Sequence, residues 1–289
     1  MNTFEFAEPR SLAEAVALLD TDDSSVRAFS GGTALMLMMK SAVFSPSLLV
    51  SLRHIEAQYA GIVPSSDGSL NIGAMASLSA VENSADVIRL APVLSQVMKR
   101  LSNVRVRNVA RIGGNLAHGD PHMDLPPTLC AMRANVIAHG PSGQRRIAIE
   151  ELFSGYYETV LGQGELITEV AVPSQSGWSS FYSKATTRTY DDWPALGVAV
   201  SIKPRDGGIE DCRIVVSAAT EKLVRLGSAE SVLRGQQAHS ATFTRAGEAA
   251  AAEAETIDDA RGSAAYKTDL LRVHVRRALQ AVADVGVQR

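Results

Sequence analysis

The sequence predicts an α+β protein with more than one structural unit. The chain has 289 residues, which exceeds a single typical hydrophobic core. Strand and helix patterns alternate in residues 1–57, as in a small parallel sheet, whereas the patterns after residue 180 are those of antiparallel strands followed by helices. Residues 174–180 (SQSGWSS) separate these parts and are the best candidate for a linker.

Composition and charge exclude several classes of protein. Hydrophobic residues make up 46% of the chain and the net charge is −3, so there is no basic field for nucleic acid and no polybasic patch for a membrane surface. Cys130 and Cys212 are too few for a disulfide framework or for an iron–sulfur cluster, which takes about four thiolates. The first ten residues carry acids where a signal peptide carries bases, and no run is long enough to span a membrane. We therefore expect a cytoplasmic protein.

The first unit begins with a short strand and a capped helix. Residues 4–6 alternate apolar and polar side chains, which predicts a strand. Ser11 is a favourable N-cap, and Glu14 stands three residues later, where it completes a capping box. The helix that follows should bury an apolar face made of Leu12, Ala15, Val16, Leu18 and Leu19.

A second strand and helix are joined by a diglycine. Residues 26–29 (VRAF) predict a short buried strand that ends at Ser30-Gly31-Gly32-Thr33. Residues 34–40 (ALMLMMK) start a helix that is apolar on nearly every side, so it should be buried. Residues 47–52 (SLLVSL) predict the next strand. This β-α-β-α-β order implies a parallel sheet with the diglycine at the carboxyl end of its second strand.

The pattern changes from residue 62 onward, where a second unit is expected. Ser77 caps the first helix of this unit, Pro141-Ser142-Gly143 forms a hairpin turn, and Pro173 ends the last strand, which alternates as a half-buried strand does. The expected elements, in order, are a strand at 69–75, helices at 77–83 and 91–101, a Gly-Gly-Asn turn at 113–115, a helix at 125–132, a hairpin of 135–139 with 145–149, a short helix at 149–153 and a strand at 165–172.

Antiparallel strands and two helices are expected in the last part of the chain. The strands are 181–185, 195–202 and 212–218, and Gly207-Gly208 supplies a hairpin turn. Residues 246–255 are rich in Ala and Glu and predict a helix. Residues 265–283 predict a longer amphipathic helix, whose apolar face holds Leu270, Leu271, Val275, Leu279 and Val282.

Two diglycine segments are the strongest candidates for a binding site. Gly31-Gly32 follows a strand and opens a helix, so the backbone can approach a ligand closely and the helix N-terminus favours phosphate. Gly113-Gly114-Asn115 repeats that arrangement, and Asn115 can bond a phosphate or brace the turn. Each diglycine alone also fits a plain turn. Neither matches the dinucleotide or P-loop signatures, so we interpret them as two halves of one pyrophosphate site.

Residues 118–124 contain a second pattern with chemical potential. His118, Asp120, His122 and Asp124 alternate, and on a strand they would share one face, as the ligands of a zinc hydrolase can. Gly119 and Pro121 interrupt a regular strand, and no second group of ligands is evident. A metal-dependent hydrolase therefore stays an alternative, and loop histidines are the simpler interpretation.

Several polar and aromatic residues have two possible roles. Asp124 precedes a helix and can cap it, or it can accept bonds from ribose or ribityl hydroxyls. Lys184 and Arg188 fit solvated surface charges. Tyr190 and Trp193 flank two aspartates and can cover a flat ring, although Trp193 also fits a hydrophobic core.

Four segments occur in the order and spacing of a known protein family. They are AFSGGTAL (28–35), RNVARIGGNLAHGDPHMDLPPTL (107–129), GELITEVAVP (164–173) and FYSKATTRTYDDWPALGVAV (181–200). With these segments the whole chain resembles the FAD-binding (medium) subunit of the molybdenum hydroxylases. That family includes aerobic carbon monoxide dehydrogenase, quinoline and nicotine oxidoreductases and the flavin domain of xanthine dehydrogenase.

The resemblance implies an α+β fold and a division into three parts. An FAD-binding domain of two subdomains, of the PCMH or vanillyl-alcohol oxidase type, spans residues 1–57 and 58–175. A C-terminal α+β domain with a small antiparallel sheet and helices spans residues 176–289.

The resemblance also implies roles for individual residues. The backbone of Ser30–Leu35 and the segment Arg111–Asn115 would hold the FAD pyrophosphate from two sides, and Asp124 would bind FAD hydroxyls. Leu166 and Ile167 would pack beside the adenine end, and Lys184 would lie near the flavin. The full cofactor-binding set is Ala28, Phe29, Ser30, Gly31, Gly32, Thr33, Ala34, Leu35, Ala110, Arg111, Gly113, Gly114, Asn115, Ala117, His118, Asp124, Leu166, Ile167 and Lys184.

Three positions depart from the family pattern. Arg111 stands where the family usually has Ser or Thr, so the hydroxyl bond to phosphate is lost. Thr33 replaces the usual Gln, His or Asn. His118-Gly119-Asp120 varies a stretch that is usually rich in Ala or Ser.

The resemblance implies an electron-transfer role for a subunit of a larger oxidoreductase. FAD would receive electrons from the [2Fe–2S] clusters of a small partner subunit and pass them to an external acceptor, while a large molybdopterin subunit hydroxylates the substrate. The complex would be a dimer of heterotrimers. No residue of this chain is then expected to be a general acid or base or a metal ligand. A scaffold that has lost FAD is a further alternative, which Arg111 makes conceivable.

Overall fold

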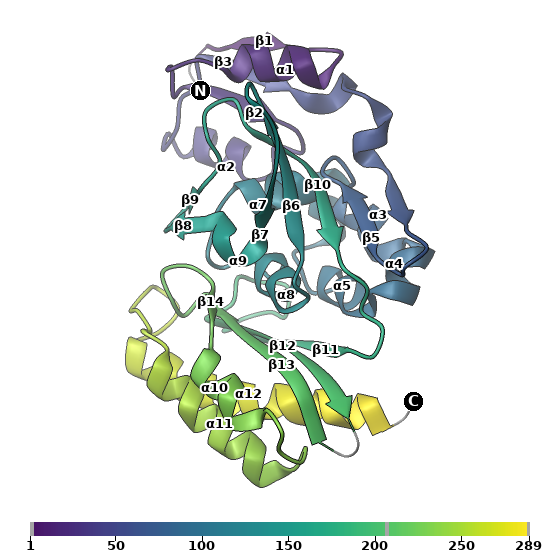
Figure 1. Cartoon of the computed structure of the whole chain (residues 1–289). Coiled ribbons are helices and arrows are strands. Elements are labelled where there is room, and N and C mark those ends of the chain that lie inside the picture. Colours follow the sequence, from purple (N-terminus) through teal and green to yellow (C-terminus); the bar gives the residue numbers. More distant parts are fainter. Residues whose placement is uncertain (1–2, 206–207, 288–289) are drawn as a thin grey trace.

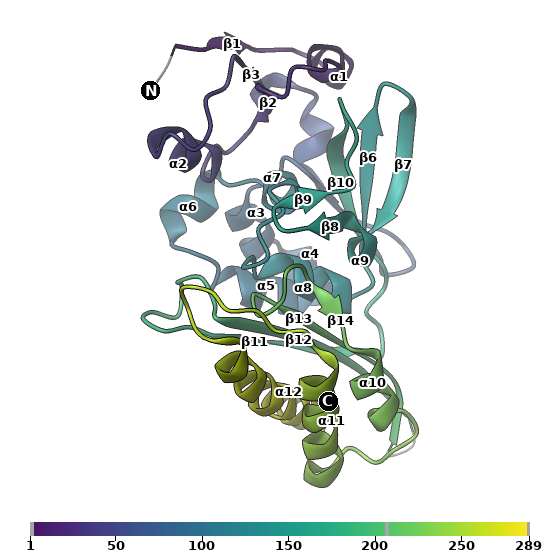
Figure 2. The same ribbon diagram turned by 90° about the vertical axis from the view of Figure 1, so that its left-hand side faces the viewer.

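The computed structural model describes residues 3–205 and 208–287, which form three units stacked along one axis (Figure 1). The N-terminal unit lies at one end, the middle unit carries the largest sheet, and the C-terminal unit closes the other end. Figure 2 shows the same stack from the side, with the antiparallel sheet of the C-terminal unit between the middle unit and the last helices.

The N-terminal unit is the parallel sheet that the sequence predicts. The strand order is β1-β3-β2, with Glu5 paired to Leu48 and Ala28 to Val50. Its elements are β1 (Glu5–Ala7), α1 (Leu12–Leu19), β2 (Val26–Phe29), α2 (Leu35–Lys40) and β3 (Leu48–Ser51), followed by 3-10 turns at Leu52–His54 and Ala57–Ala60.

Three local expectations for this unit are wrong. Ser11 caps α1, but the Glu14 carboxylate accepts from the N–H of Arg10 instead of completing the box at Ser11. Leu18 of the expected apolar face is exposed, and β2 is only partly buried. The small core of this unit forms between α1, Val50 and Leu166, on the side of the sheet that α1 covers.

The helix α2 is not buried, which contradicts the expectation from its composition. Met39 is 5% exposed, but Leu37 is 57% exposed. No residue of α2 belongs to the core of its unit. Composition alone could not show this, because a short apolar helix at the edge of a small sheet has too few neighbours to cover every face.

The middle unit is built on a five-stranded antiparallel sheet. The strand order is β4-β5-β10-β6-β7, so the predicted strand β10 (Leu166–Val172) lies in the centre and is buried on both faces instead of one. The other strands are β4 (Ile62–Pro64), β5 (Leu70–Gly73), β6 (Asn135–Gly140) and β7 (Gly143–Ala148), and a separate ribbon pairs β8 (Phe153–Gly155) with β9 (Glu158–Thr159).

Seven helices pack against this sheet and its loops. They are α3 (Leu78–Asn83), α4 (Ala85–Leu90), α5 (Pro92–Met98), α6 (Val104–Val109), α7 (Ile112–Ala117), α8 (Leu125–Ala131) and α9 (Ile149–Leu152). Ser77 caps α3 as expected. The Gly-Gly-Asn segment is not a turn, because it forms the first turns of α7.

The C-terminal unit is a four-stranded antiparallel sheet backed by helices. The order β11-β12-β13-β14 is sequential, and Lys184 pairs with Gly197. The elements are β11 (Ser179–Ala185), β12 (Leu196–Arg205), β13 (Gly208–Ser217), β14 (Val224–Arg225), α10 (Gly227–Leu233), α11 (Ser240–Glu253) and α12 (Ala264–Val287). Gly208 begins β13, and the other residue of the expected hairpin turn, Gly207, lies outside the described residues.

The last helix buries most of the face that the sequence predicts. Leu271, Val275, Leu279 and Val282 belong to the core of the C-terminal unit, whereas Leu270 packs at its edge. In the part of the chain that the structure describes, no helix is both long and apolar enough to cross a membrane.

Candidate functional site

The two diglycine segments lie against each other. A Cβ built on Gly31 would be 2.2 Å from the carbonyl oxygen of Val109, two residues before Arg111. A Cβ built on Gly114 would be 3.1 Å from Oγ of Ser30. The end of β2 and the start of α7 are far apart in the sequence, yet their backbones lie so close together that a side chain on Gly31 would not fit.

The first segment presents a row of backbone donors. Residues 31–35 form no backbone hydrogen bond through their N–H groups within the described ranges 3–205 and 208–287. Gly32 has a φ of +66°, and a Cβ there would be 2.6 Å from the ring of Phe29. The ring of Phe6 contacts Phe29 edge-on. The conformation therefore requires glycine and leaves the amides available to an acceptor.

The second segment is partly buried and partly open. A Cβ on Gly113 would be 2.6 Å from Cβ of Ala74, so this glycine is required by packing. Gly114 and Ala117 are exposed on the face that follows Arg111. Arg111 is the N-cap residue of α7 without a side-chain capping bond. Its guanidinium makes no hydrogen bond or ion pair to another described residue, so it can reach a ligand.

The side-chain amide of Asn115 has a hydrogen-bond partner for its nitrogen but none for its oxygen among the described residues. Its Nδ2 donates to Sδ of Met123 at 3.2 Å. Its Oδ1 is buried and has no hydrogen-bond partner among the described residues. An unpaired buried acceptor is costly, so this amide indicates a ligand or ordered water beside α7. It does not brace a turn.

The alternating residues from His118 to Asp124 face different partners. Nδ1 of His122 lies 3.0 Å from Asp120, and Nε2 lies 3.0 Å from Asp259 of the C-terminal unit. Asp124 instead faces residues of β11. Within the residues that the structure describes, no three His, Cys, Asp or Glu side chains are arranged to hold a metal ion. The strand geometry behind the hydrolase alternative is therefore absent here.

Asp124 forms a buried ion pair with Lys184. Nζ of Lys184 lies 2.8 Å from Oδ2 of Asp124, and the two side chains are 3% and 5% exposed. The hydroxyl of Tyr182 donates to Oδ1 at 2.6 Å. Burial raises the pKa of the Asp124 carboxyl, and the Lys184 ammonium opposes this rise. Asp124 makes no capping bond to α8, and Lys184 is not a solvated surface charge.

His118 is partly buried in the same region and lies beside an aromatic pair. Its ring contacts Tyr157 at a centroid distance of 5.2 Å, and Tyr157 contacts Tyr156 at 4.9 Å. Burial lowers the pKa of His118. Burial also raises the pKa of Tyr157, and the Asp120 carboxylate adds to this effect. No feature of the sequence selects Tyr157, because its contact with His118 depends on the β8–β9 ribbon.

Leu166 and Ile167 join two units of the protein. Leu166 packs into the core of the N-terminal unit with Leu12 and Val50, whereas Ile167 packs into the core of the middle unit. Both residues are buried. The start of β10 therefore lies at the junction between the two units.

The loop after Lys184 is open to solvent. Trp193 is 46% exposed, so it is not a core residue, and Tyr190 is more exposed still. Arg188 bonds Asp192 at 3.1 Å. The guanidinium of Arg261 lies 5.7 Å from the centre of the Trp193 ring. This contact from the C-terminal unit had no signal in the sequence.

Comparison with known proteins gives one consistent result. Residues 2–175 match the family described as "FAD binding domain in molybdopterin dehydrogenase", and residues 180–282 match "CO dehydrogenase flavoprotein C-terminal domain". The chain is similar to the carbon monoxide dehydrogenase medium chain of Hydrogenophaga pseudoflava, with 33% identity and 96% of each chain covered. It is also similar to the nicotine 6-hydroxylase medium subunit of Paenarthrobacter nicotinovorans, with 31% identity and 95% of each covered.

A solved structure shows the same likeness in three dimensions. The carbon monoxide dehydrogenase from Hydrogenophaga pseudoflava that lacks the Mo-pyranopterin moiety superimposes with a TM-score of 0.94. The match covers 98% of both chains at 33% identity.

Proposed function

The chain belongs to the family of FAD-binding medium subunits of the molybdenum hydroxylases, and from this membership we propose that its two diglycine segments hold the pyrophosphate of FAD. Its cofactor is FAD, and it is a flavoprotein subunit of an oxidoreductase. The observation that carries the proposal is the close approach of Gly31 to Val109 and of Gly114 to Ser30, which brings the two segments side by side.

The residues of both segments fit a pyrophosphate. The unbonded amides of Gly31–Leu35 and the hydroxyls of Ser30 and Thr33 are donors, as phosphate oxygens require. Arg111 can supply a positive charge where the family usually has a hydroxyl. The unpaired Oδ1 of Asn115 can accept a bond from a cofactor hydroxyl or amine. The remaining backbone contacts of the proposed site come from Ala28, Phe29, Ala110, Gly113, Ala117 and His118.

Asp124 and Lys184 can contact FAD while they stay paired. A carboxylate has about four acceptor positions, and the bonds from Tyr182 and Lys184 occupy two of those on Asp124. The others can accept ribityl hydroxyls. Leu166 and Ile167 would then support the adenine end from behind, since both are buried in the joint between the first two units.

When bound, FAD supplies the redox chemistry by which electrons from the [2Fe–2S] clusters of a partner subunit reach an external acceptor. The residues of this chain bind and orient the cofactor, and the buried Asp124–Lys184 pair excludes water from one side of it. Several relatives are named as medium chains or subunits. We therefore include a large molybdopterin subunit and a small iron–sulfur subunit as partners, in a dimer of heterotrimers in the cytoplasm.

The proposal divides the chain at residues 57/58 and 175/176. The first two parts would enclose FAD, and residues 176–289 would close the site with β11 and the loop after it. The separate three-, five- and four-stranded sheets of the three units support this division. The hydrolase alternative has no comparable support, since His122 and Asp124 face different partners.

Cofactor content tests the proposal. The purified chain should carry about one flavin, or take up added FAD, and should show the visible absorption of an oxidised flavin. The variant Gly114→Val should fold and lose most of this binding, because the valine side chain would enter the space beside Ser30. A chain that stays colourless and does not bind added FAD would overturn the proposal.

A further inference from the structure

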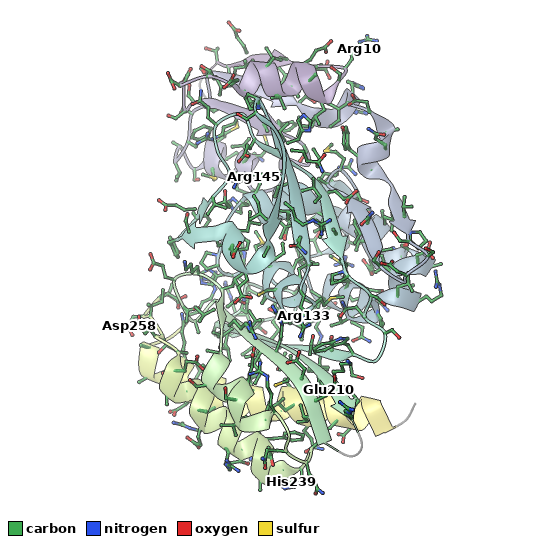
Figure 3. All side chains as sticks on the ribbon, in the orientation of Figure 1. Arg10, Arg133, Arg145, Glu210, His239 and Asp258 are labelled. Atoms are coloured by element: carbon green, nitrogen blue, oxygen red, sulfur yellow. The ribbon has the colours of Figure 1, made fainter. Side chains whose placement is uncertain are left out.

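A tight turn between α11 and α12 carries one charged side chain to the middle unit and another to the loop between β11 and β12. Asp259 and Gly262 exchange backbone hydrogen bonds of 3.1 and 3.3 Å, and the N–H of Arg261 donates to Oδ1 of Asp259 at 2.8 Å. Figure 3 shows the preceding residue, Asp258, at the edge of the molecule beside the start of α12. These bonds within the turn fix its backbone independently of the contacts that its side chains make with other loops.

The carboxylate of Asp259 contacts residues of the C-terminal unit and of the middle unit. Its Oδ2 lies 2.8 Å from Nζ of Lys267 and 3.0 Å from Nε2 of His122. Lys267 is fully buried and donates also to the carbonyl oxygen of Ala218 at 3.1 Å. Burial raises the pKa of Asp259, but the bonds from Lys267 and His122 outweigh it and lower the pKa to about 2.

His122 lies in the loop that contains His118 and Asp124, and it connects Asp259 to this loop. Its Nδ1 lies 3.0 Å from Oδ1 of Asp120, and its backbone N–H donates to the same oxygen at 2.9 Å. The carbonyl oxygen of Pro121 also accepts from the N–H of Ala218 at 2.9 Å. The loop is therefore held at its centre, between the two residues that the proposed function places at the cofactor.

Arg261 reaches the second loop. Its guanidinium lies over the ring of Trp193. The backbone N–H of Trp193 lowers the pKa of Asp192 against the opposing effect of burial, and Arg188 and then Arg261 add smaller effects in the same direction. This loop follows Lys184. One turn thus contacts both loops that adjoin the Asp124–Lys184 pair.

We propose that the turn Asp259–Gly262 positions the FAD site by fixing two loops at once, the first through His122 and the second through Trp193. This inference rests on the proposed function. Asp259 and Arg261 are positioning residues that act through His122 and Trp193 and make no contact with the cofactor themselves. Movement of the turn changes the position of both loops relative to the Asp124–Lys184 pair.

The test compares FAD binding by three variants of the full chain. Asp259→Asn removes the charge at the first loop, and Arg261→Ala removes the contact at the second without emptying a core. Asp269→Asn is the matched control, because this aspartate is 74% exposed and, among the described residues, pairs only with Arg272. FAD titration gives the dissociation constant, and visible circular dichroism and the midpoint potential of the bound flavin report its surroundings.

The first two variants should raise the FAD dissociation constant by about 3- to 30-fold and change the dichroism and potential, while Asp269→Asn matches the unmodified chain. In a Trp178→Phe background, Trp193 is the only tryptophan, and Arg261→Ala should weaken the quenching of its emission by FAD.

A double-mutant cycle tests the route through His122. If Asp259 acts through that ring, His122→Gln combined with Asp259→Asn should lose no more affinity than the more severe single variant. Fully additive losses would overturn this route.

Two further results separate the proposals. Variants that unfold more easily but bind FAD with unchanged affinity, dichroism and potential would overturn this inference alone. Absence of FAD binding by the unmodified chain would overturn the proposed function, and this inference with it.

Discussion

Three glycines in the candidate site differ in what a side chain would meet. At Gly31 a Cβ would collide with the backbone of Val109 and Ala110, at Gly113 with Ala74, and at Gly114 only with the hydroxyl of Ser30. A backbone cannot yield as a serine rotamer can. The first two glycines are therefore needed for the fold, whereas the third is needed mainly for the open space beside it.

This difference predicts opposite results for two alanine variants. Gly31→Ala should destabilise the chain by about 2–4 kcal/mol, since it forces two segments apart. Gly114→Ala should change stability by less than about 1 kcal/mol and weaken FAD binding. Chemical denaturation and FAD titration of both variants check this. Equal loss of stability in the two would contradict the assignment of Gly114 to the ligand side.

The buried pair of Lys184 and Asp124 predicts a large effect of removing one partner. Lys184→Met leaves a carboxylate in a site with 5% exposure, so the free energy of unfolding should fall by about 3–5 kcal/mol. Lys203→Met is the control, because its ion pair with Glu210 lies at the surface and should contribute less than about 1 kcal/mol. Urea denaturation of both variants measures the difference.

The lowered pKa of Asp259 predicts that the stability of the protein depends on pH, with a definite sign. Its pKa is lowered from 3.8 to about 2, so its contribution is present above pH 4 and is lost as the pH falls toward 2. At neutral pH this contribution should be about 1–2 kcal/mol, after solvent screening at a side chain that is 19% exposed. The stability difference between the unmodified chain and Asp259→Asn should therefore shrink from pH 6 to pH 3. A constant difference over this range would be inconsistent with a lowered pKa.

At the scale of elements, local patterns predicted most strands and helices, and tertiary packing decided the rest. Residues 48–51, 135–148 and 264–287 have clear periods and form the expected elements. The Gly-Gly-Asn segment forms the first turns of α7, where Gly113 packs so closely on Ala74 that no side chain fits, and no local pattern contains that neighbour. The contact of His122 with Asp259 spans 137 positions and has no local signal either.

The burial of α2 differs from what its apolar composition predicts, and two variants test this difference. Leu37→Gln should change the free energy of unfolding by less than about 0.5 kcal/mol, because this leucine is largely exposed. Met39→Ala, two residues away and 5% exposed, should cost about 2–3 kcal/mol. Thermal unfolding of the isolated chain checks both. A large loss for Leu37→Gln would mean that α2 is covered in solution.

At the scale of the whole molecule, specific contacts near the candidate site add to a broader interface, in which Tyr182, Ala199, Val215 and Leu223 of the third unit pack into the core of the second. Leu166 belongs to the core of the first unit although β10 belongs to the second. Lys184 and Asp259 of the third unit pair with Asp124 and His122 of the second. Because these contacts lie beside the proposed cofactor residues, a ligand bound there should stabilise the contacts between all three units.

This arrangement predicts how FAD changes unfolding. FAD at about one hundred times its dissociation constant should add roughly 2.7 kcal/mol and raise the unfolding temperature by about 5 °C or more. Because the site includes residues of all three units, calorimetry should show the whole transition moving. If FAD shifts only part of the transition in the unmodified chain, the site does not extend across the three units, and the roles proposed for Lys184 and Asp259 fail.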